Sequence, residues 1–432
     1  MVDYGTISWL FMPFGLALLI GIPISFSMIL GVVTFIIATS TLPVEVLSHQ
    51  MFQTVSSFPM MAIPFFVLAG DLMDRAGISV RLMDFTQAIF GRFRGGQAQV
   101  MVGTECIFSG LSGSAVADTV AMLKIFGPHM EKQGYPKDYV AALGAACGVL
   151  GPIIPPSIIM IVYGATLNVS VGGLFIGGIV PGIVMGGCIM CLNYYNALRH
   201  NWPRSTERFT FRLVFQGLKD ASLALLVPFI ILAGIYGGVF TATEGGAITV
   251  GYSLVLGCFV YRTLKLKDIR DCLVQSAIIS AVILLIIGAS NPFGWVMTKY
   301  QIPQMFAQTI LGISMNKWAV ITLINILVLI AGCLMEGAAI ILLLGPMLAP
   351  VAYQVGFSPM HFAMIVIVNI SIGMITPPVG VNLFAAVPVS GTTMTRICRA
   401  IMPFILVEII SLILIILIPG FTLWLPELIR KM

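Results

Sequence analysis

Apolar residues follow one another along this chain in runs far longer than the core of a water-soluble protein needs. Residues 5–44 and 139–198 contain no Asp, Glu, Lys or Arg, and residues 337–395 contain none either, although His361 lies among them. A helix needs only about 20 apolar residues to cross the hydrocarbon layer of a bilayer. The pattern therefore predicts an all-α polytopic membrane protein. The first run has no basic start and is too long for a cleavable signal peptide, so we expect it to stay in the membrane.

Two of these uncharged runs are interrupted by a pair of prolines, in GPIIPPSI at 151–158 and in MITPPVGVN at 374–382. Proline lacks a backbone donor and pushes the residue before it toward an extended conformation, so each pair should end a helix. Non-helical backbone at membrane depth is tolerated only where protein buries it or where it lines a wet cavity. We predict broken helices or hairpin tips there, with a simple kink as the alternative. Free carbonyls beside the hydroxyls of Ser157 and Thr376 would form a neutral oxygen cage that suits sodium.

A polar stretch, SGLSGSAVADT at 109–119, stands out against these surroundings. Its serines and glycines make a poor helix and a good cage for a ligand, because glycine lets the backbone come close. Close packing of helices through small residues is the alternative. An ionisable residue inside a membrane segment is a functional candidate by default, which applies to Asp118 and Glu336. Asp118 could instead cap a helix at the membrane interface.

Similar landmarks recur in the two halves of the chain. The separation along the chain from Asp118 to Glu336 is nearly the same as that from Pro155 to Pro377. A weaker match pairs PISFSMILG at 23–31 with GGAITVGYSLVLG at 245–257. Transporters are often built from such repeats, commonly in inverted orientation. We predict an internal duplication, against the alternative that Gly and Pro coincide by chance.

Composition and the distribution of charge predict how the chain is oriented in the membrane. Only 9% of the 432 residues are charged, against about 25% in a soluble domain, and the net charge is +5. The basic residues concentrate in three segments: 75–94, 199–219 and 262–270. The positive-inside rule makes these segments cytoplasmic, so they set orientation and do not indicate nucleic-acid binding.

Other reactive side chains fit structural roles. The C-x-x-C of Cys188 and Cys191 lacks a second pair and nearby histidines, so we expect buried, inert thiols rather than metal or redox chemistry. We expect Glu244 to cap a helix start together with Thr241 or Thr243. We expect His361 to be hydrogen-bonded or solvated rather than a ligand.

Missing motifs narrow the function. The chain has no G-x-x-x-x-G-K-[ST] phosphate-binding loop, so transport would be driven by an ion gradient rather than by ATP bound to this chain. An ion channel could use the same oxygen cages, although paired halves with acids inside favour alternating access. The GLSG at 110–113 also matches an intramembrane serine protease with Ser112 as nucleophile, but such a serine needs a base within hydrogen-bonding reach.

Four motifs in order, SGLSGSAVADTVA, GPIIPPS, FTATEGGA and ITPPVGVNLF, resemble those of the large membrane subunit (M subunit) of tripartite ATP-independent periplasmic (TRAP) transporters. The resemblance covers nearly the whole chain. It implies a multi-pass secondary transporter of the bacterial inner membrane, not an enzyme, that imports a carboxylate such as sialic acid or a C4-dicarboxylate with at least two Na⁺ ions. A stand-alone sodium- or proton-coupled anion carrier is the alternative.

The resemblance also implies a site, residue by residue. One sodium site would use Ser109, Ser112, Gly151, Ile154 and Pro155. A second would use Gly332, Gly373, Thr376 and Val379, the last through its backbone only. The substrate would lie between them near Ser112, Ser157 and Glu336, where bound sodium offsets the acid and Glu336 accepts substrate hydroxyls.

The implied architecture is an inverted-repeat elevator with two re-entrant hairpins and broken helices. The first repeat would span 1–198, with scaffold helices to about 95 and a transport part from about 96. A basic cytoplasmic connector would follow at 199–220. The second repeat would span 221–432, with scaffold helices to about 315 and a transport part from about 316. The implied partners are a small membrane subunit (Q subunit) as a separate chain, a periplasmic substrate-binding protein (P subunit) and membrane lipid.

Overall fold

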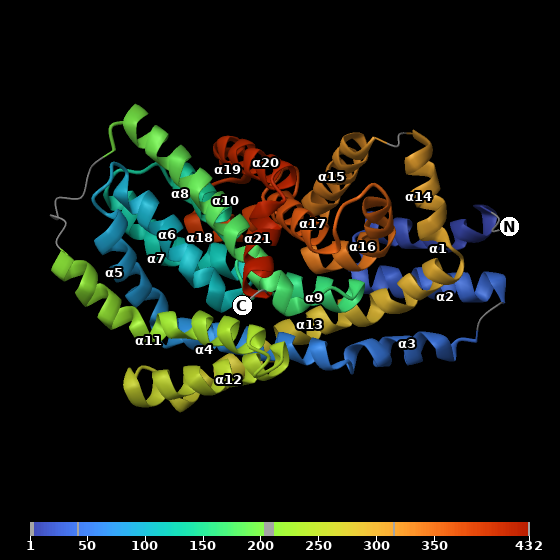
Figure 1. Cartoon of the computed structure of the whole chain (residues 1–432), viewed down its shortest axis with the longest axis horizontal. Helices are drawn as coiled ribbons and strands as arrows, with labels where there is room; N and C mark the ends of the chain where they lie inside the picture. Colours follow the sequence, from blue (N-terminus) through green and yellow to red (C-terminus); the bar gives the residue numbers. More distant parts are fainter. Residues whose placement is uncertain (1–3, 41–42, 203–210, 314–315, 431–432) are drawn as a thin grey trace.

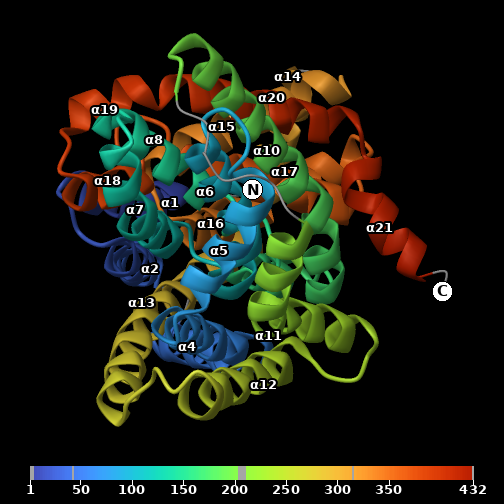
Figure 2. The same ribbon diagram turned by 90° about the vertical axis from the view of Figure 1, so that its left-hand side faces the viewer.

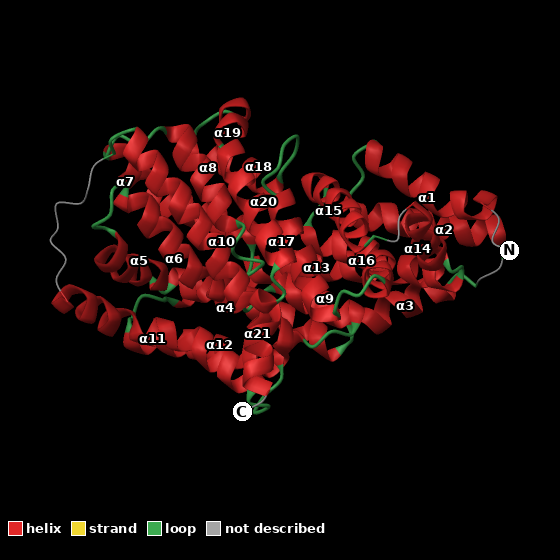
Figure 3. Ribbon diagram, turned by 45° about the horizontal axis from the view of Figure 1, so that its top comes forward, coloured by secondary structure: helices red, strands yellow, loops and turns green. Residues whose placement is uncertain are grey.

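All regular structure in the described residues is helical, which confirms the predicted all-α class (Figure 3). The structure is a computed structural model that describes residues 4–40, 43–202, 211–313 and 316–430. The helices of the first half are α1 (Tyr4–Leu19), α2 (Ile24–Thr39), α3 (Glu45–Val55), η1 (Phe58–Met61), α4 (Ala62–Arg75), α5 (Ile78–Phe90), α6 (Gly96–Ser112), α7 (Ala115–Lys132), α8 (Lys137–Gly148), α9 (Ile158–Leu167) and α10 (Val171–Arg199).

The second half contains a similar succession of helices. They are α11 (Phe211–Tyr236), α12 (Ala242–Val255), η2 (Leu256–Val260), α13 (Leu266–Lys299), α14 (Ile302–Ile313), α15 (Lys317–Leu334), α16 (Gly337–Gln354), α17 (Pro359–Gly373), α18 (Val381–Ser390), α19 (Met394–Ala400), α20 (Met402–Leu417) and α21 (Gly420–Arg430). Residues 203–210 of the predicted basic connector lie outside the described residues, and residues 211–220 form the start of α11.

The predicted multi-pass character is supported by helix length and composition. Six described helices are long and apolar enough to cross a membrane, and the number rises to eight if each of two bent helix pairs forms one span. One bent pair joins α3 to η1 and α4 at 60°, and the other joins α19 to α20 at 45°. The molecule is elongated, with α1, α2 and α14 near one end and α5 and α7 near the other (Figure 1).

The helices themselves recur at a constant offset along the chain. Helices α7 and α16 have the same length, so the offset between their starts at Ala115 and Gly337 also separates their ends. The ends of α6 and α15 are separated by this same offset, and so are the starts of α8 and α17. A constant offset between whole helices is explained by coincidence far less easily than one between single prolines. It therefore supports the predicted duplication.

This register corrects one detail of the sequence comparison. At the offset that relates the helices, the counterpart of Glu336 is Ser114, because Ser114 precedes α7 as Glu336 precedes α16. Asp118 instead lies in the first turn of α7, and its counterpart is the apolar Ile340. The two acids are therefore not equivalent positions of the repeat, whereas Pro155 and Pro377 are separated by the same offset as the helices.

The two halves are interleaved rather than side by side. Helix α9 of the first half packs against α16 of the second, and α18 of the second half packs against α7 and α8 of the first. At one end of the molecule, α4 packs between α12 and α13, and α11 packs against α5 (Figure 2). Helices of each half are therefore packed partly by helices of the other half.

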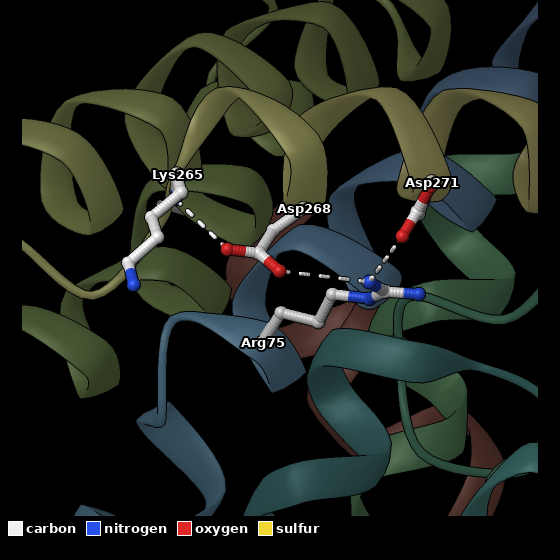
Figure 4. A network of polar contacts seen from close by, with 4 residues as sticks. All are labelled: Arg75, Lys265, Asp268 and Asp271. Carbon is white, nitrogen blue, oxygen red and sulfur yellow. Dashed lines mark hydrogen bonds and ion pairs between the residues drawn. The ribbon is translucent and has the colours of Figure 1, made fainter.

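Two of the predicted basic segments meet at the start of α13. Figure 4 shows Arg75 between Asp268 and Asp271. Its guanidinium lies 4.0 Å from Asp268 and 3.7 Å from Asp271, and the backbone N–H of Lys265 donates to Asp268 at 2.9 Å. Exposed pairs of this kind contribute about 0–1 kcal/mol, so they orient the ends of α4 and α13 more than they stabilise them. Their meeting places both segments on one side of the protein, as the positive-inside rule requires.

Three local predictions can be compared with the structure. Glu244 and Thr241 form a capping box at the start of α12, as expected: the Thr241 N–H donates to Glu244 at 2.7 Å. His361 is buried and hydrogen-bonded through Nδ1 to the Thr422 hydroxyl at 2.8 Å, which fits the expected structural role. The expectation of buried thiols is wrong for both cysteines of the C-x-x-C, because Cys191 is exposed on α10 and Cys188 is only half-buried there.

The contact between α7 and α8 generates a stability prediction. A Cβ on Gly148 would stand 2.5 Å from the Ala115 carbonyl oxygen and would clash with the Thr119 hydroxyl. We expect Gly148→Ala to destabilise the protein by about 1–3 kcal/mol through overpacking, seen as a lower melting temperature of the purified protein. Gly187→Ala in α10 is the control, because no atom lies within 4 Å of its new Cβ. Equal melting temperatures for the two variants would contradict the packing argument.

Candidate functional site

Two helix breaks form the centre of the candidate site. Residues 149–157 separate α8 from α9, and residues 374–380 separate α17 from α18. Both breaks contain a cis peptide bond within their proline pair, Pro155–Pro156 and Pro377–Pro378. The predicted helix ends at the proline pairs are therefore confirmed, and the alternative of a simple kink is excluded.

The first break receives the tip of a helical hairpin formed by α6 and α7. Gly113 ends α6 in the left-handed region at φ +65, and a Cβ there would stand 2.7 Å from the Pro156 carbonyl oxygen. A Cβ on Gly110 would stand 3.1 Å from the Pro155 carbonyl oxygen. Glycine is needed at the tip for its backbone conformation and for this close approach. The two proline carbonyls consequently face the hairpin.

The serines of the polar stretch lie on this hairpin, but mostly within regular helix. Ser109 and Ser112 belong to α6, so the expectation that the stretch is poorly helical is wrong except at Gly113 and Ser114. The helix persists because the stretch is packed on several sides, and tertiary packing overrides weak propensity. The Ser109 hydroxyl is fully buried and has no hydrogen-bond partner among the described residues.

Gly151 lies at the start of the first break and touches the second helix of the hairpin. A Cβ on Gly151 would collide with the Asp118 carboxylate and stand 3.2 Å from the Ser114 carbonyl carbon. Asp118 is fully buried in the first turn of α7, where the N-cap position belongs to Ser114 rather than to Asp118. At the far end of this break, the Ser157 hydroxyl caps α9 by accepting from the Met160 N–H at 3.3 Å. The side chain of Ile154 packs on Gly182 of α10, which leaves only its backbone for a ligand.

The second break receives the hairpin formed by α15 and α16 in a related way. A Cβ on Gly332 would stand 2.8 Å from the Cα of Gly373, so the two helices touch through their backbones. The Gly380 N–H donates to the Cys333 carbonyl at 3.1 Å. The Thr376 hydroxyl donates to the Ile372 carbonyl at 2.8 Å, which leaves its oxygen able to accept or to coordinate. Val379 is half-buried between Thr376 and Gly380.

The tip of the second hairpin also meets the first turn of α9, which directly follows the first break. A Cβ on Gly337 would stand 2.5 Å from the Ile159 side chain and 2.9 Å from that of Ile370. This contact brings the segment of Glu336 beside the segment of Ser157. Glu336 is exposed and directly precedes α16 at the tip of this hairpin. The structure thus brings the predicted residues of both halves toward one region.

Sequence reasoning missed several buried polar residues. Glu105 on α6 is fully buried beside Asp118, and neither carboxylate has a basic partner among the described residues. Glu408 on α20 is also fully buried and without a hydrogen-bond partner there. The signal was available for both, because each is a lone acid within an apolar run. The proximity of these acids to other groups could not be predicted, since it depends on contacts between helices that are far apart in sequence.

Asn382 is a further candidate that the sequence analysis passed over. It lies at the start of α18, directly after the second break, and is fully buried. Neither its amide nitrogen nor its amide oxygen has a hydrogen-bond partner among the described residues. A buried amide with both ends unsatisfied is costly, so it points to a missing ligand or water. The sequence could have indicated Asn382, because it is the last residue of the motif MITPPVGVN.

These features define a class of protein. Broken helices with buried non-helical backbone and matching hairpins in two repeats belong to polytopic secondary transporters. The described residues contain no group of three or more His, Cys, Asp and Glu side chains that could hold a metal ion. The family follows from comparison. Residues 11–421 match the family of the tripartite ATP-independent periplasmic transporter, DctM component. The chain belongs to this family, the large permease component of TRAP transporters.

Individual relatives are similar along nearly the whole chain. The sialic acid TRAP transporter large permease protein SiaM of Vibrio cholerae is 36% identical over 94% of this chain and 95% of its own length. The C4-dicarboxylate TRAP transporter large permease protein DctM of Pseudomonas aeruginosa is 38% identical over 89% of this chain and 90% of its own length. The isethionate TRAP transporter permease protein DctMQ of Oleidesulfovibrio alaskensis is 38% identical over 95% of this chain, which spans only 65% of that relative.

Solved structures agree on the fold. The YdaH transporter of Alcanivorax borkumensis superposes with a TM-score of 0.62 at 15% identity and covers 88% of both chains. Neisseria gonorrhoeae MtrF, described as one of a class of antimetabolite efflux pumps, superposes with a TM-score of 0.54 at 12% identity, over 88% of this chain and 84% of its own. These identities support a shared transporter fold and nothing finer.

The contact between Gly151 and Asp118 generates a second prediction. We expect Gly151→Ala to destabilise the protein by about 1–3 kcal/mol, because the new methyl group displaces the carboxylate or the hairpin. Asp118→Ala should relieve part of that clash, so the double variant should be more stable than the two single effects predict. A coupling energy of about 0.5–3 kcal/mol is typical for residues in contact. Melting of the four proteins of this double-mutant cycle measures it.

A matched control uses Gly127 in the same helix as Asp118. No atom lies within 4 Å of a Cβ built on Gly127. Gly127→Ala combined with Asp118→Ala should therefore give additive effects. Additivity in the Gly151 cycle as well would show that the hairpin does not depend on this contact.

Proposed function

We propose that the protein imports an organic carboxylate, such as sialic acid or a C4-dicarboxylate, across the bacterial inner membrane in symport with sodium. The observation that carries the proposal is the pair of hairpin tips packed on two proline breaks. Such an arrangement presents backbone carbonyls and hydroxyls together inside the protein. Neutral oxygen groups of this kind suit a hard monovalent cation, and membership of the TRAP family supplies the transport context.

The first sodium site would lie between the α6–α7 hairpin and the first break. The buried, unpartnered hydroxyl of Ser109 and the carbonyls facing Gly110 and Gly113 fit an oxygen-coordinated cation. Ser112 and the backbone of Gly151, Ile154 and Pro155 would complete it. Asp118, in contact with Gly151, would supply a negative charge close to the ion. A buried carboxylate without a basic partner is otherwise unfavourable, so a cation nearby explains its presence.

The second sodium site would lie where the α15–α16 hairpin touches the second break. Gly332 and Gly373 bring two backbones together, and the Thr376 hydroxyl and the Val379 carbonyl lie on the adjoining turn. The substrate would sit between the two sites, near Ser112, Ser157 and Glu336, with the Asn382 amide as an additional hydrogen-bonding group. Two positive ions would offset the repulsion between Glu336 and a carboxylate substrate, and binding of ion and substrate would then be reciprocally linked.

Transport would follow an elevator mechanism. Helices to about residue 95 and from 221 to about 315 would form the scaffold, and the helices from about 96 to 198 and from about 316 would move with the site. Helices α5 and α14 join the two parts, and each directly precedes a hairpin. Relatives that are named permease proteins support a transporter rather than an enzyme.

The protein would work with two partners. A periplasmic binding protein would deliver the substrate, and a small membrane subunit would be supplied as a separate chain. The relative named DctMQ is longer than this chain, which is compatible with a fused second part in that protein. The alternative is a carrier that works alone.

Reconstitution tests the proposal as a whole. Proteoliposomes would hold this chain with its small partner subunit, with the periplasmic binding protein outside loaded with labelled sialic acid or a C4-dicarboxylate. We expect uptake that requires both an inward sodium gradient and the binding protein. Uptake without the binding protein would favour the stand-alone carrier. Uptake that is indifferent to sodium would contradict the sodium coupling.

The first sodium site gives a specific prediction. Ser112→Ala removes one proposed ligand, so the sodium concentration for half-maximal uptake should rise about tenfold, which corresponds to about 1.4 kcal/mol. Ser170→Ala is the control, since Ser170 caps α10 by accepting from the Gly173 N–H at 3.1 Å and lies outside both breaks. An unchanged sodium dependence in Ser112→Ala would remove this residue from the site.

A further inference from the structure

A charged recess lies between α5 and α11, away from the breaks. It has a volume of about 560 Å³, within the range of about 300–1,000 Å³ that is usual for ligand sites. The residues that line it are Val80, Arg81 and Asp84 of α5, Lys219, Asp220 and Leu223 of α11, and Tyr261, which follows η2. Two basic and two acidic side chains gather there in a chain with only 9% charged residues. We call this site the α5–α11 recess.

The four charges do not neutralise one another as ion pairs. None of these four side chains takes part in the ion pairs seen at Arg75 and Lys137. The Arg81 guanidinium lies 3.7 Å from the centre of the Tyr261 ring and donates to the Gly77 carbonyl at 2.8 Å. The Arg81 guanidinium therefore retains N–H donors for a further acceptor, because a guanidinium has five N–H groups. The recess thus offers unpaired charge of both signs.

The two acids repel each other. Burial and the nearby Asp220 carboxylate raise the pKa of Asp84, and Arg81 partly offsets them. A ligand cation between the two carboxylates would remove that repulsion. Next to them, Arg81 and Lys219 would attract an anion. The Tyr261 hydroxyl is also buried without a hydrogen-bond partner among the described residues, so one more polar group of the recess is unsatisfied.

The position of the recess suits the membrane surface. Helix α5 is not among the candidate spans, whereas α11 is. Arg81 and Lys219 belong to the basic segments that the positive-inside rule places at the cytoplasmic face. From the recess, α11 continues with exposed apolar side chains on a neighbouring face, Leu223 at 38% and Leu226 at 40% exposure. A molecule bound there would meet charge at one end and an apolar helix face at the other.

We propose that the α5–α11 recess binds the headgroup of an aminophospholipid, a phosphate joined to a primary ammonium group, from the inner leaflet. Arg81 and Lys219 would hold the phosphate, and Asp84 and Asp220 would accept hydrogen bonds from the ammonium. The acyl chains would lie along Leu223 and Leu226. A choline headgroup has no N–H to donate, and a glycerol headgroup brings no positive charge to the two acids, so both should bind more weakly.

Native mass spectrometry of the full chain in detergent tests the proposal. The protein would be titrated with phosphatidylethanolamine, phosphatidylcholine and phosphatidylglycerol of identical acyl chains, and separately with soluble phosphoethanolamine. We expect phosphatidylethanolamine to bind at least tenfold more tightly than the other two lipids. Equal binding of the three lipids would overturn the proposal. Binding of soluble phosphoethanolamine without binding of the lipid would show that the site takes a free solute, which also overturns it.

Variants separate the two ends of the headgroup. Asp84→Asn combined with Asp220→Asn should remove the preference for phosphatidylethanolamine, and Lys219→Ala should weaken the binding of all three lipids. Asp271→Asn is the matched control, because it changes an acid on the same side of the protein that contacts Arg75 outside the recess. Lys219 and Asp220 are exposed. The single variants Lys219→Ala and Asp220→Asn should therefore fold even if the double variant Asp84→Asn with Asp220→Asn does not. A preference that survives both acid substitutions, or that is lost equally in Asp271→Asn, contradicts the assignment.

Discussion

The structure depends on one constraint: backbone that is not helical must be covered by protein wherever the chain is surrounded by hydrocarbon. The two proline breaks interrupt helices in the most apolar parts of the sequence and would be unfavourable on their own. Each is covered by a hairpin whose glycines allow backbone to approach backbone, at Gly113 over Pro156 and at Gly332 over Gly373. The same coverage brings backbone carbonyls and serine hydroxyls together inside the protein.

Much of this could be predicted from local sequence. The proline pairs predicted the breaks because proline acts on its immediate neighbours, and the capping box of Thr241 and Glu244 is likewise local. The hairpin tip at Gly110 and Gly113 lies against the carbonyls of Pro155 and Pro156, next to the serines that the sequence singled out.

Other features could not be predicted, for physical reasons. Glu336 was matched with Asp118 because both are acids, yet the helix register pairs Glu336 with Ser114. A repeat preserves backbone position more directly than side-chain type, so the comparison of motifs by charge was misleading. The neighbourhood of Glu105 and Asp118 and the charges of the α5–α11 recess depend on contacts between helices, which no local pattern contains.

The interleaving of the halves has a consequence for how the protein is made. Helix α9 packs on α16, and α7 packs on α18, so elements of the first half leave the ribosome well before the surfaces that cover them exist. Domains generally fold as units during synthesis, with the N-terminal part first. Here the first hairpin and its broken helix stay incompletely packed in the membrane until the second half is inserted. Biogenesis of this chain therefore contains an obligatory interval of exposure, during which a chaperone or protease can act on the unfinished first half.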